Sequence, residues 1–159
     1  MCGISGIIEL NRPEVDSGAP RRMADAIRHR GPDDEGYLMA NHRTNQCLIV
    51  GGVDTPDDVY KSAFPYSPRK PIGAGIGEGM NMALANRRLA ILDLSPAGHQ
   101  PMCNGDRTLW IVHNGEIYNF REIRIELEAL GHSFKSRSDT EVILHAYDQW
   151  GADCVQRFN

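Results

Sequence analysis

The sequence lacks long apolar runs and has no excess of positive charge. Its 159 residues carry 17 Lys and Arg against 21 Asp and Glu, and the net charge is -4. No stretch approaches the roughly 20 apolar residues needed to cross a bilayer. The start, MCGISGIIEL, lacks the basic residues and the longer apolar segment of a secretory signal. We therefore expect a cytoplasmic protein that binds neither membranes nor nucleic acid.

Cysteine is also sparse. Cys2, Cys47, Cys103 and Cys154 lie far apart, and no CxxC pair occurs. Structural zinc sites need clustered Cys and His ligands, and disulfide frameworks are uncommon in chains without a secretory signal. We expect no metal in this chain, and we interpret Cys47, Cys103 and Cys154 as reduced structural or surface thiols.

The length fits one domain, and apolar periodicity divides it into elements. The pattern predicts strands over 2–10, 36–40, 47–51, 82–86, 89–93 and 108–113, and helices over 20–28, 119–131 and 139–150. Gly131 is typical of a helix C-terminus, and Ser138 with Glu141 is typical of a capping box. Strands dominate the first two thirds of the chain and two helices close it, which indicates the α+β class.

Residues 52–80 are rich in Gly, Pro and Asp and predict a long loop or insertion. The stretch GAGIGEG at 73–79 has some likeness to a phosphate-binding loop. However, Glu78 stands at the sixth position, where that motif has Gly, and no strand and helix flank it. A flexible loop is the better interpretation, with glycines that would allow hinge motion.

Cys2 is a candidate nucleophile. If Met1 is removed, one residue carries both a thiol and an α-amine, whose pKa in model peptides is about 8. The thiol could then attack while the amine takes its proton. The alternative is an inert buried thiol. We do not expect a lipid anchor on Cys2, because its signal needs a longer preceding motif than one Met.

Three other features could contribute to a site. The amide of Asn114 and the N–H of Gly115 could bind an oxyanion, although Asn-Gly is also a common hairpin turn. Arg87 and Arg88 could bind a carboxylate, although most arginines are simply solvated. Asp139 could bind an ammonium group, although the helix dipole also favours an acid at this position.

In combination these signals are specific. The relevant segments, in chain order, are MCGISGI, HRGPDDEG, NRRLAILDLSPAGHQPM, HNGEIYNFREIRIELEALGH, SRSDTEVILHAYDQWG and ADCVQRFN. Together they closely resemble the glutaminase domain of glutamine-hydrolysing asparagine synthetase. That domain is a class II glutamine amidotransferase, and these belong to the N-terminal-nucleophile hydrolases. The resemblance covers the chain except for 41–80.

The resemblance implies a catalytic role for three residues. Cys2 would attack the side-chain amide of L-glutamine, form a glutamyl thioester and release ammonia. Asn114 and Gly115 would hold the tetrahedral intermediate. This domain would need no cofactor of its own. Its ammonia would pass to a synthetase domain of the same full-length protein, where ATP and Mg2+ are expected.

The resemblance also implies a substrate pocket. Arg88 would bind the α-carboxylate of glutamine, and Glu116 and Asp139 would bind its α-ammonium group. The main chain that ends at Leu92 would form one wall, and residues 30–31 would shape the site from a neighbouring loop.

The implied fold is an αββα sandwich that continues past residue 159, so we expect the domain to be truncated here. An unpaired sheet edge would then favour a homodimer. The family commonly has His where Asn86 stands, and a retained Met1 would block the base. Both features keep a rival open, a non-catalytic glutamine-binding scaffold. A papain-like pair of Cys2 with His99 or His113 is a third interpretation.

Overall fold

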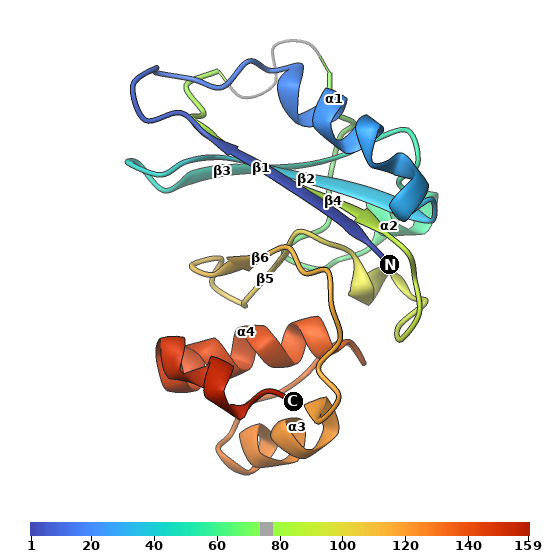
Figure 1. Ribbon diagram of the computed structural model, residues 1–159, viewed down its shortest axis with the longest axis vertical. Coiled ribbons are helices and arrows are strands. Elements are labelled where there is room, and N and C mark those ends of the chain that lie inside the picture. The colour runs from blue at the N-terminus through green and yellow to red at the C-terminus, as the bar shows by residue number, and fades with distance from the viewer. Residues whose placement is uncertain (74–77) are drawn as a thin grey trace.

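Helix, sheet, sheet and helix follow one another in layers, as the side view in Figure 1 shows. This computed structural model describes residues 1–73 and 78–159. Helix α1 (Ala19–Ala26) covers one face of a four-stranded sheet. A two-stranded sheet lies beyond the other face, followed by α3 (Phe120–Ala129) and α4 (Asp139–Trp150). The predicted α+β class is confirmed, and every strand pair within the two sheets is antiparallel.

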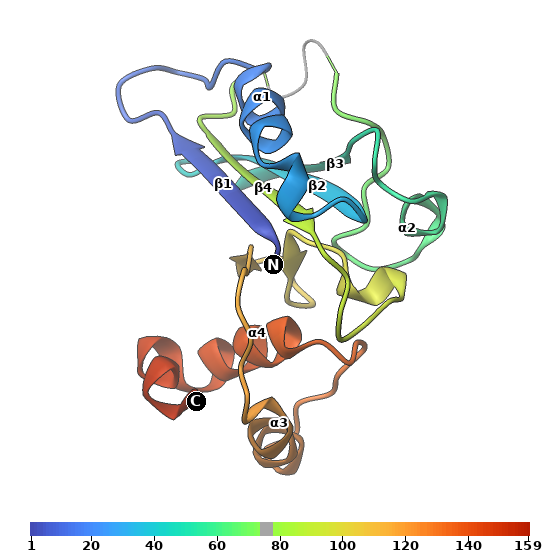
Figure 2. The same cartoon turned by 45° about the vertical axis from the view of Figure 1, so that its right-hand side comes forward.

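The larger sheet has the order β1-β4-β2-β3. Its strands are β1 (Gly3–Ile8), β2 (Asp34–Asn41), β3 (Gln46–Gly51) and β4 (Met82–Arg88). Residues along β2 are buried at almost every position, because one face packs under α1 and the other faces the lower layers. Figure 2 shows the same stacking from a second direction. Four of the predicted strands therefore form one sheet.

The lower half is built on a helical core. Ile123 and Leu127 of α3 pack against Val142 and Ala146 of α4, with Cys154 closing the cluster. Gly131 has φ +98° and follows the end of α3, as its sequence position predicted. The remaining short helices are η1 (Arg28–Arg30), α2 (Asp57–Lys61), η2 (Pro96–Gly98) and η3 (Gly151–Arg157).

Two strand predictions were wrong. Residues 89–93 form an irregular segment, since the N–H of Ala90 bonds to the Asp33 carboxylate rather than to a neighbouring strand. The predicted strand over 108–113 shrinks to β6 (Trp110–Ile111). Its partner β5 (Met102–Cys103) was not predicted, because two residues carry no periodicity.

The segment predicted as a loop over 52–80 is partly ordered and packed. It contains α2, and Gly51 forms a bridge with Pro71. The Tyr66 hydroxyl is buried and donates a hydrogen bond of 2.8 Å to the carbonyl of Ala97. The expectation of a flexible glycine loop falls largely on residues 74–77, which lie outside the described residues. None of the helices within the described ranges has the length and apolar character needed to cross a membrane.

Candidate functional site

A cavity of about 340 Å³ opens between the end of β4 and the helical layer. All seven residues predicted for the site border it: Cys2, Arg88, Leu92, Asn114, Gly115, Glu116 and Asp139. They come from segments that are distant in sequence. The structure therefore brings the predicted residues together, and their individual roles stay predictions.

Cys2 reaches the cavity because of the β1–β4 register. Gly3 lies opposite Arg87, so Cys2 lies beside the chain that leaves β4. The Cys2 sulfur accepts a hydrogen bond of 3.3 Å from the N–H of Leu89, and it lies 3.6 Å from the Leu89 carbonyl. Arg30 donates to the carbonyl of Cys2 at 3.5 Å. The nucleophile candidate is thus held from both sides at the cavity wall.

The cavity has an upper wall at the end of β4 and a lower wall on the side of α3 and α4. Arg88 supplies a positive charge on the upper wall. Its guanidinium is mostly buried and donates hydrogen bonds to the carbonyls of Asp93 and Ser95. Gly98 lies so close that a Cβ atom there would clash with Nη2 of Arg88. A guanidinium has five N–H donors, and those not used by the two carbonyls can bind a substrate carboxylate.

Asp93 holds the loop that carries these carbonyls. Its carboxylate accepts from the N–H and hydroxyl of Ser95, at 2.9 and 2.6 Å, and from the N–H of Arg137 at 2.8 Å. Burial acts to raise the pKa of Asp93, but these hydrogen bonds outweigh it and hold the pKa below its ordinary value. Asp93 is therefore a charged anchor between the upper loop and the segment before α4.

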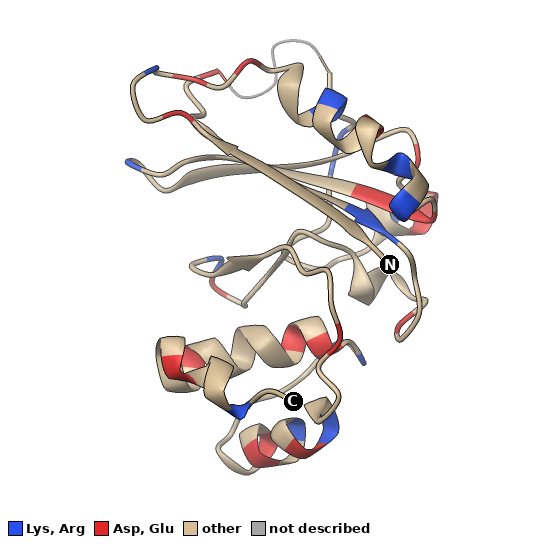
Figure 3. Cartoon of the chain, in the orientation of Figure 1, with Lys and Arg blue, Asp and Glu red and all other residues tan. Residues whose placement is uncertain are grey.

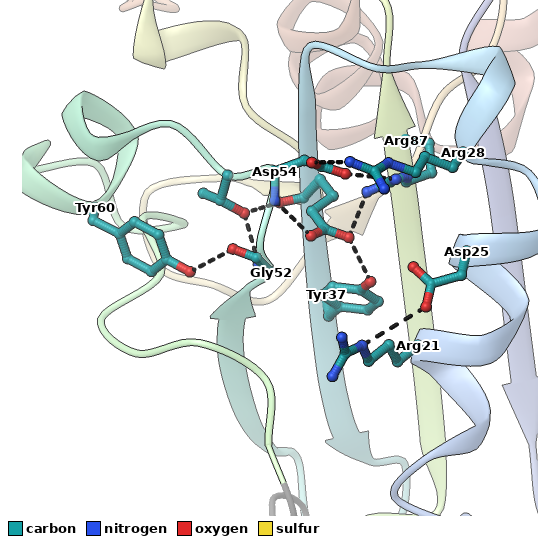
Figure 4. A network of polar contacts seen from close by, with 10 residues as sticks. Arg21, Asp25, Arg28, Tyr37, Gly52, Asp54, Tyr60 and Arg87 are labelled. Carbon is teal, nitrogen blue, oxygen red and sulfur yellow. Dashed lines mark hydrogen bonds and ion pairs between the residues drawn. The ribbon is translucent and has the colours of Figure 1, made fainter.

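Arg87 points away from the cavity, since neighbouring residues of a strand face opposite sides. Its guanidinium is fully buried and pairs with Glu35 at 2.5 Å and with Asp54 at 2.8 Å (Figure 4). The Tyr37 hydroxyl donates to the same Glu35 carboxylate at 2.7 Å. Of the two arginines that the sequence offered for a carboxylate, only Arg88 remains available to a substrate.

The lower wall carries Asn114, Gly115 and Glu116. They lie in the connection between β6 and α3, so the Asn-Gly pair is not a hairpin turn here. All three are exposed and border the cavity. Asp139 is the first residue of α4, and its carboxylate accepts a hydrogen bond of 3.0 Å from the N–H of Ile117. That bond ties the start of α4 to the connection.

The capping box predicted at α4 forms only in part. Ser138 caps the helix by accepting from the N–H of Thr140 at 3.1 Å. Glu141 does not reach back to Ser138. Its carboxylate accepts instead from the N–H groups of Lys135 and Ser136, at 2.9 and 2.6 Å. It therefore orders the loop that leads into the site.

Two imidazoles lie near the cavity. His113 borders it, and burial lowers its pKa while the charge of Asp139 acts in the opposite direction. His99 is fully buried and lies 2.7 Å from the carboxylate of Asp34. The hydrogen bonds of the Cys2 thiol in the described structure go to Leu89. The papain-like interpretation therefore gains no support.

Sequence reasoning passed over several polar residues of the cavity wall, among them Asp93, Gln100 and Thr140. Each is a common residue type, and no sequence motif or spacing marks it as a site residue. The one available signal is position, because Asp93 and Gln100 lie inside the tract NRRLAILDLSPAGHQPM and Thr140 follows Asp139.

The charge arrangement suits a zwitterion. Arg88 supplies a positive charge on one wall, and Glu116 and Asp139 supply negative charges on the other. Figure 3 shows basic positions at the end of β4 and acidic positions at the start of α4 and in the segment before α3. A thiol, an exposed amide and both signs of charge could bind an amino acid and attack its side chain.

Comparison with known proteins gives a consistent picture. The family described as "Glutamine amidotransferase domain" matches residues 46–159. Glutamine-hydrolysing asparagine synthetase 3 of Bacillus subtilis (strain 168) is 32% identical across 100% of this chain, which covers 20% of that protein. Glutamine-hydrolysing asparagine synthetase 2 of the same strain is 36% identical across 98% of this chain, which covers 16% of that protein. The chain thus spans about a fifth of the length of these curated relatives.

Proposed function

The chain belongs to the glutamine amidotransferase domain family, and from that premise we propose that it hydrolyses the side-chain amide of L-glutamine through a thioester on Cys2. One observation carries the proposal. The Cys2 thiol and an oppositely charged pair, Arg88 and Asp139, border the same cavity. Its volume lies in the range typical of small-molecule sites.

Substrate binding follows from the charges of the walls. The α-carboxylate of glutamine pairs with the free N–H groups of Arg88, and the α-ammonium group pairs with Glu116 and Asp139. The chain from Arg88 to Leu92 forms the wall beside the side chain of the substrate. Bound in this way, glutamine extends its amide toward Cys2.

The chemistry proceeds in two steps. The sulfur of Cys2 bonds to the amide carbon, and the α-amine of Cys2 takes the thiol proton and passes it to the amide nitrogen. The carbon–nitrogen bond then breaks and ammonia leaves. Water attacks the resulting thioester, the carbon–sulfur bond breaks, and glutamate and the free thiol are restored.

The oxyanion of each tetrahedral intermediate needs hydrogen-bond donors. The Asn114 amide and the Gly115 N–H would supply them, since both residues are exposed and border the cavity. One such donor contributes about 3–4 kcal/mol to lowering the barrier in comparable sites.

The mechanism requires the removal of Met1. While Met1 is attached, the nitrogen of Cys2 is an amide, whose lone pair is delocalised into the carbonyl and cannot act as a base. Removal converts it to an amine on the same carbon as the thiol side chain. The proposal therefore applies to the chain that begins at Cys2.

In the longer protein, we propose that the ammonia serves an ATP- and Mg2+-dependent synthetase domain that forms asparagine or a related amide. The names of the relatives and the small share of their length that this chain spans support this role. The layer order of Figure 1 supports the N-terminal-nucleophile hydrolase sandwich as its fold.

Ammonia release from L-glutamine tests the proposal directly. The chain without Met1 should release ammonia, and Cys2→Ala should lower the rate at least a thousandfold, because the nucleophile is lost. Cys47→Ala is the matched control, since Cys47 is also a free, half-buried cysteine but lies on β3. It should keep the wild-type rate.

Calorimetry with L-glutamine separates the enzyme from a non-catalytic scaffold. The Cys2→Ala variant should still bind glutamine, because the charged groups of the walls remain. Binding without ammonia release by the processed wild-type chain would overturn the proposal in favour of the scaffold. Unchanged release by Cys2→Ala would show that Cys2 is not the nucleophile.

A further inference from the structure

The side chain of Gln100 joins three separate elements beside the cavity. Its Oε1 accepts from the Asn86 amide of β4 at 3.2 Å and from the N–H of His113 at 2.6 Å. Its Nε2 donates to the Thr140 hydroxyl of α4 at 3.3 Å. Gln100 is only 6% exposed, so these bonds replace water contacts that the amide would otherwise make.

The first of these bonds reaches the strand that carries the carboxylate-binding group. Asn86 and Arg88 are two residues apart on β4 and therefore face the same side of the sheet. Asn86 is itself fully buried and bonds to Gln100 through its amide nitrogen. Gln100 is thus fixed relative to the strand that ends at Arg88.

The other two bonds reach the opposite wall. His113 directly precedes Asn114, the proposed oxyanion donor, and Thr140 directly follows Asp139, the proposed ammonium-binding acid. The Thr140 hydroxyl also lies 3.4 Å from Nδ1 of His113, which closes a small ring of polar contacts around the Gln100 amide.

We propose that Gln100 is a positioning residue, which sets the separation between the carboxylate-binding, ammonium-binding and oxyanion-binding groups. The inference rests on the proposed glutaminase function and deepens it. A primary amide accepts two hydrogen bonds at its oxygen and donates from its nitrogen, which matches the three bonds that Gln100 makes here. A misplacement of about 1 Å in such groups can cost a hundredfold in rate.

Kinetics of the Met1-processed chain test the proposal first. Gln100→Met keeps the length and volume of the side chain and removes all three bonds. We expect kcat for glutamine hydrolysis to fall at least tenfold, with a rise in KM. Thr140→Val removes the bond from Gln100 to α4 and the longer Thr140–His113 contact, and it keeps the two bonds at Oε1 of Gln100, so it should raise KM with a smaller change in kcat. Gln46→Met, the same change at an exposed position of β3, should leave both unchanged.

Amide hydrogen exchange gives a readout that does not depend on turnover. The N–H of Ile117 bonds to Asp139 and not to Gln100, so it reports whether the connection and α4 stay together. In Gln100→Met its exchange should accelerate at least tenfold, and in Gln46→Met it should not change. If Gln100 only filled space in the core, Gln100→Met would leave the exchange rate of the Ile117 N–H unchanged.

The two readouts separate the two proposals. A folded Gln100→Met chain with kcat and KM within twofold of wild type and unchanged Ile117 exchange would overturn the positioning role. If the processed wild-type chain does not hydrolyse glutamine, the proposed function fails. The Ile117 exchange would then still decide whether Gln100 holds the connection and α4 together.

Discussion

Two neighbouring arginines show how much a single residue's function depends on the side it faces. Arg87 and Arg88 have the same chemistry, yet Arg87 is fully buried with Glu35 and Asp54 while Arg88 borders the cavity. Alternation along β4 separates them, and the register with β1 decides which one lies beside Cys2. The sequence offers both arginines for a carboxylate, with simple solvation as the alternative, and the resemblance selects Arg88.

Gly98 offers a test of Arg88 that leaves the arginine in place. In Gly98→Ala the added methyl group would meet the guanidinium, so Arg88 must move. We expect KM for glutamine to rise about tenfold, equivalent to about 1.4 kcal/mol of lost substrate binding. Gly105→Ala is the control, because a Cβ atom there meets open space. Equal KM values for both variants in a glutamine titration would contradict the role of Arg88.

The residues of the site differ in how far a sequence reveals them. Cys2 beside a removable Met1 and the Asn114–Gly115 pair are candidates from their chemistry, and the family resemblance assigns their roles. Gln100 is not, because its importance lies in three hydrogen bonds to distant segments. Such contacts exist only once the fold has placed those segments side by side.

At the scale of elements, long periodic segments were predictable and short ones were not. Helices α3 and α4 begin and end close to the residues that their apolar spacing and Gly131 predict. The strands β5 and β6 have two residues each, and the segment 89–93 satisfies its backbone through side chains such as Asp33. The apolar residues of 89–93 have the spacing of a strand, but no neighbouring strand within the described residues pairs with this segment.

The start of α4 gives a prediction about pH. Burial acts to raise the pKa of Glu141, but the His145 imidazole 3.8 Å away and the hydrogen bonds from Ser136 and Lys135 outweigh it and hold the pKa below its ordinary value. The folded state therefore gains stability from the ionised form above about pH 4.3, and loses it as the pH falls through the folded pKa. Glu141→Gln should reduce the free energy of unfolding at pH 7 by about 2 kcal/mol.

Chemical denaturation at several pH values measures this effect. The difference between wild type and Glu141→Gln should be constant between pH 6 and pH 8 and should shrink below about pH 4. Glu122→Gln, at an exposed position of α3, is the control and should cost about 0.5 kcal/mol or less at every pH. If the loss of unfolding free energy in Glu141→Gln instead grew as the pH falls, the pKa of Glu141 would be raised in the folded state and the prediction would be wrong.

At the scale of the whole molecule, the site exists only where the two halves of the fold meet. The upper half supplies Cys2 and Arg88 at the end of the larger sheet, and the lower half supplies Asn114, Glu116 and Asp139. Each half has its own apolar cluster, one under α1 and one between α3 and α4. Sequence patterns predicted the strands of the larger sheet and the helices α3 and α4, but not the polar contacts that join the two halves.

Mass spectrometry of the intact chain tests the central claim, that Cys2 is the free N-terminal nucleophile of a glutamine site. The chain is measured before and after incubation with a glutamine analogue that alkylates thiols, with L-glutamine as competitor. We predict loss of Met1 and one adduct on Cys2 that glutamine suppresses. The other thiols supply an internal control, since burial raises the pKa of Cys103 to about 12. A retained Met1 with no adduct, or an adduct elsewhere in the chain, would contradict the claim.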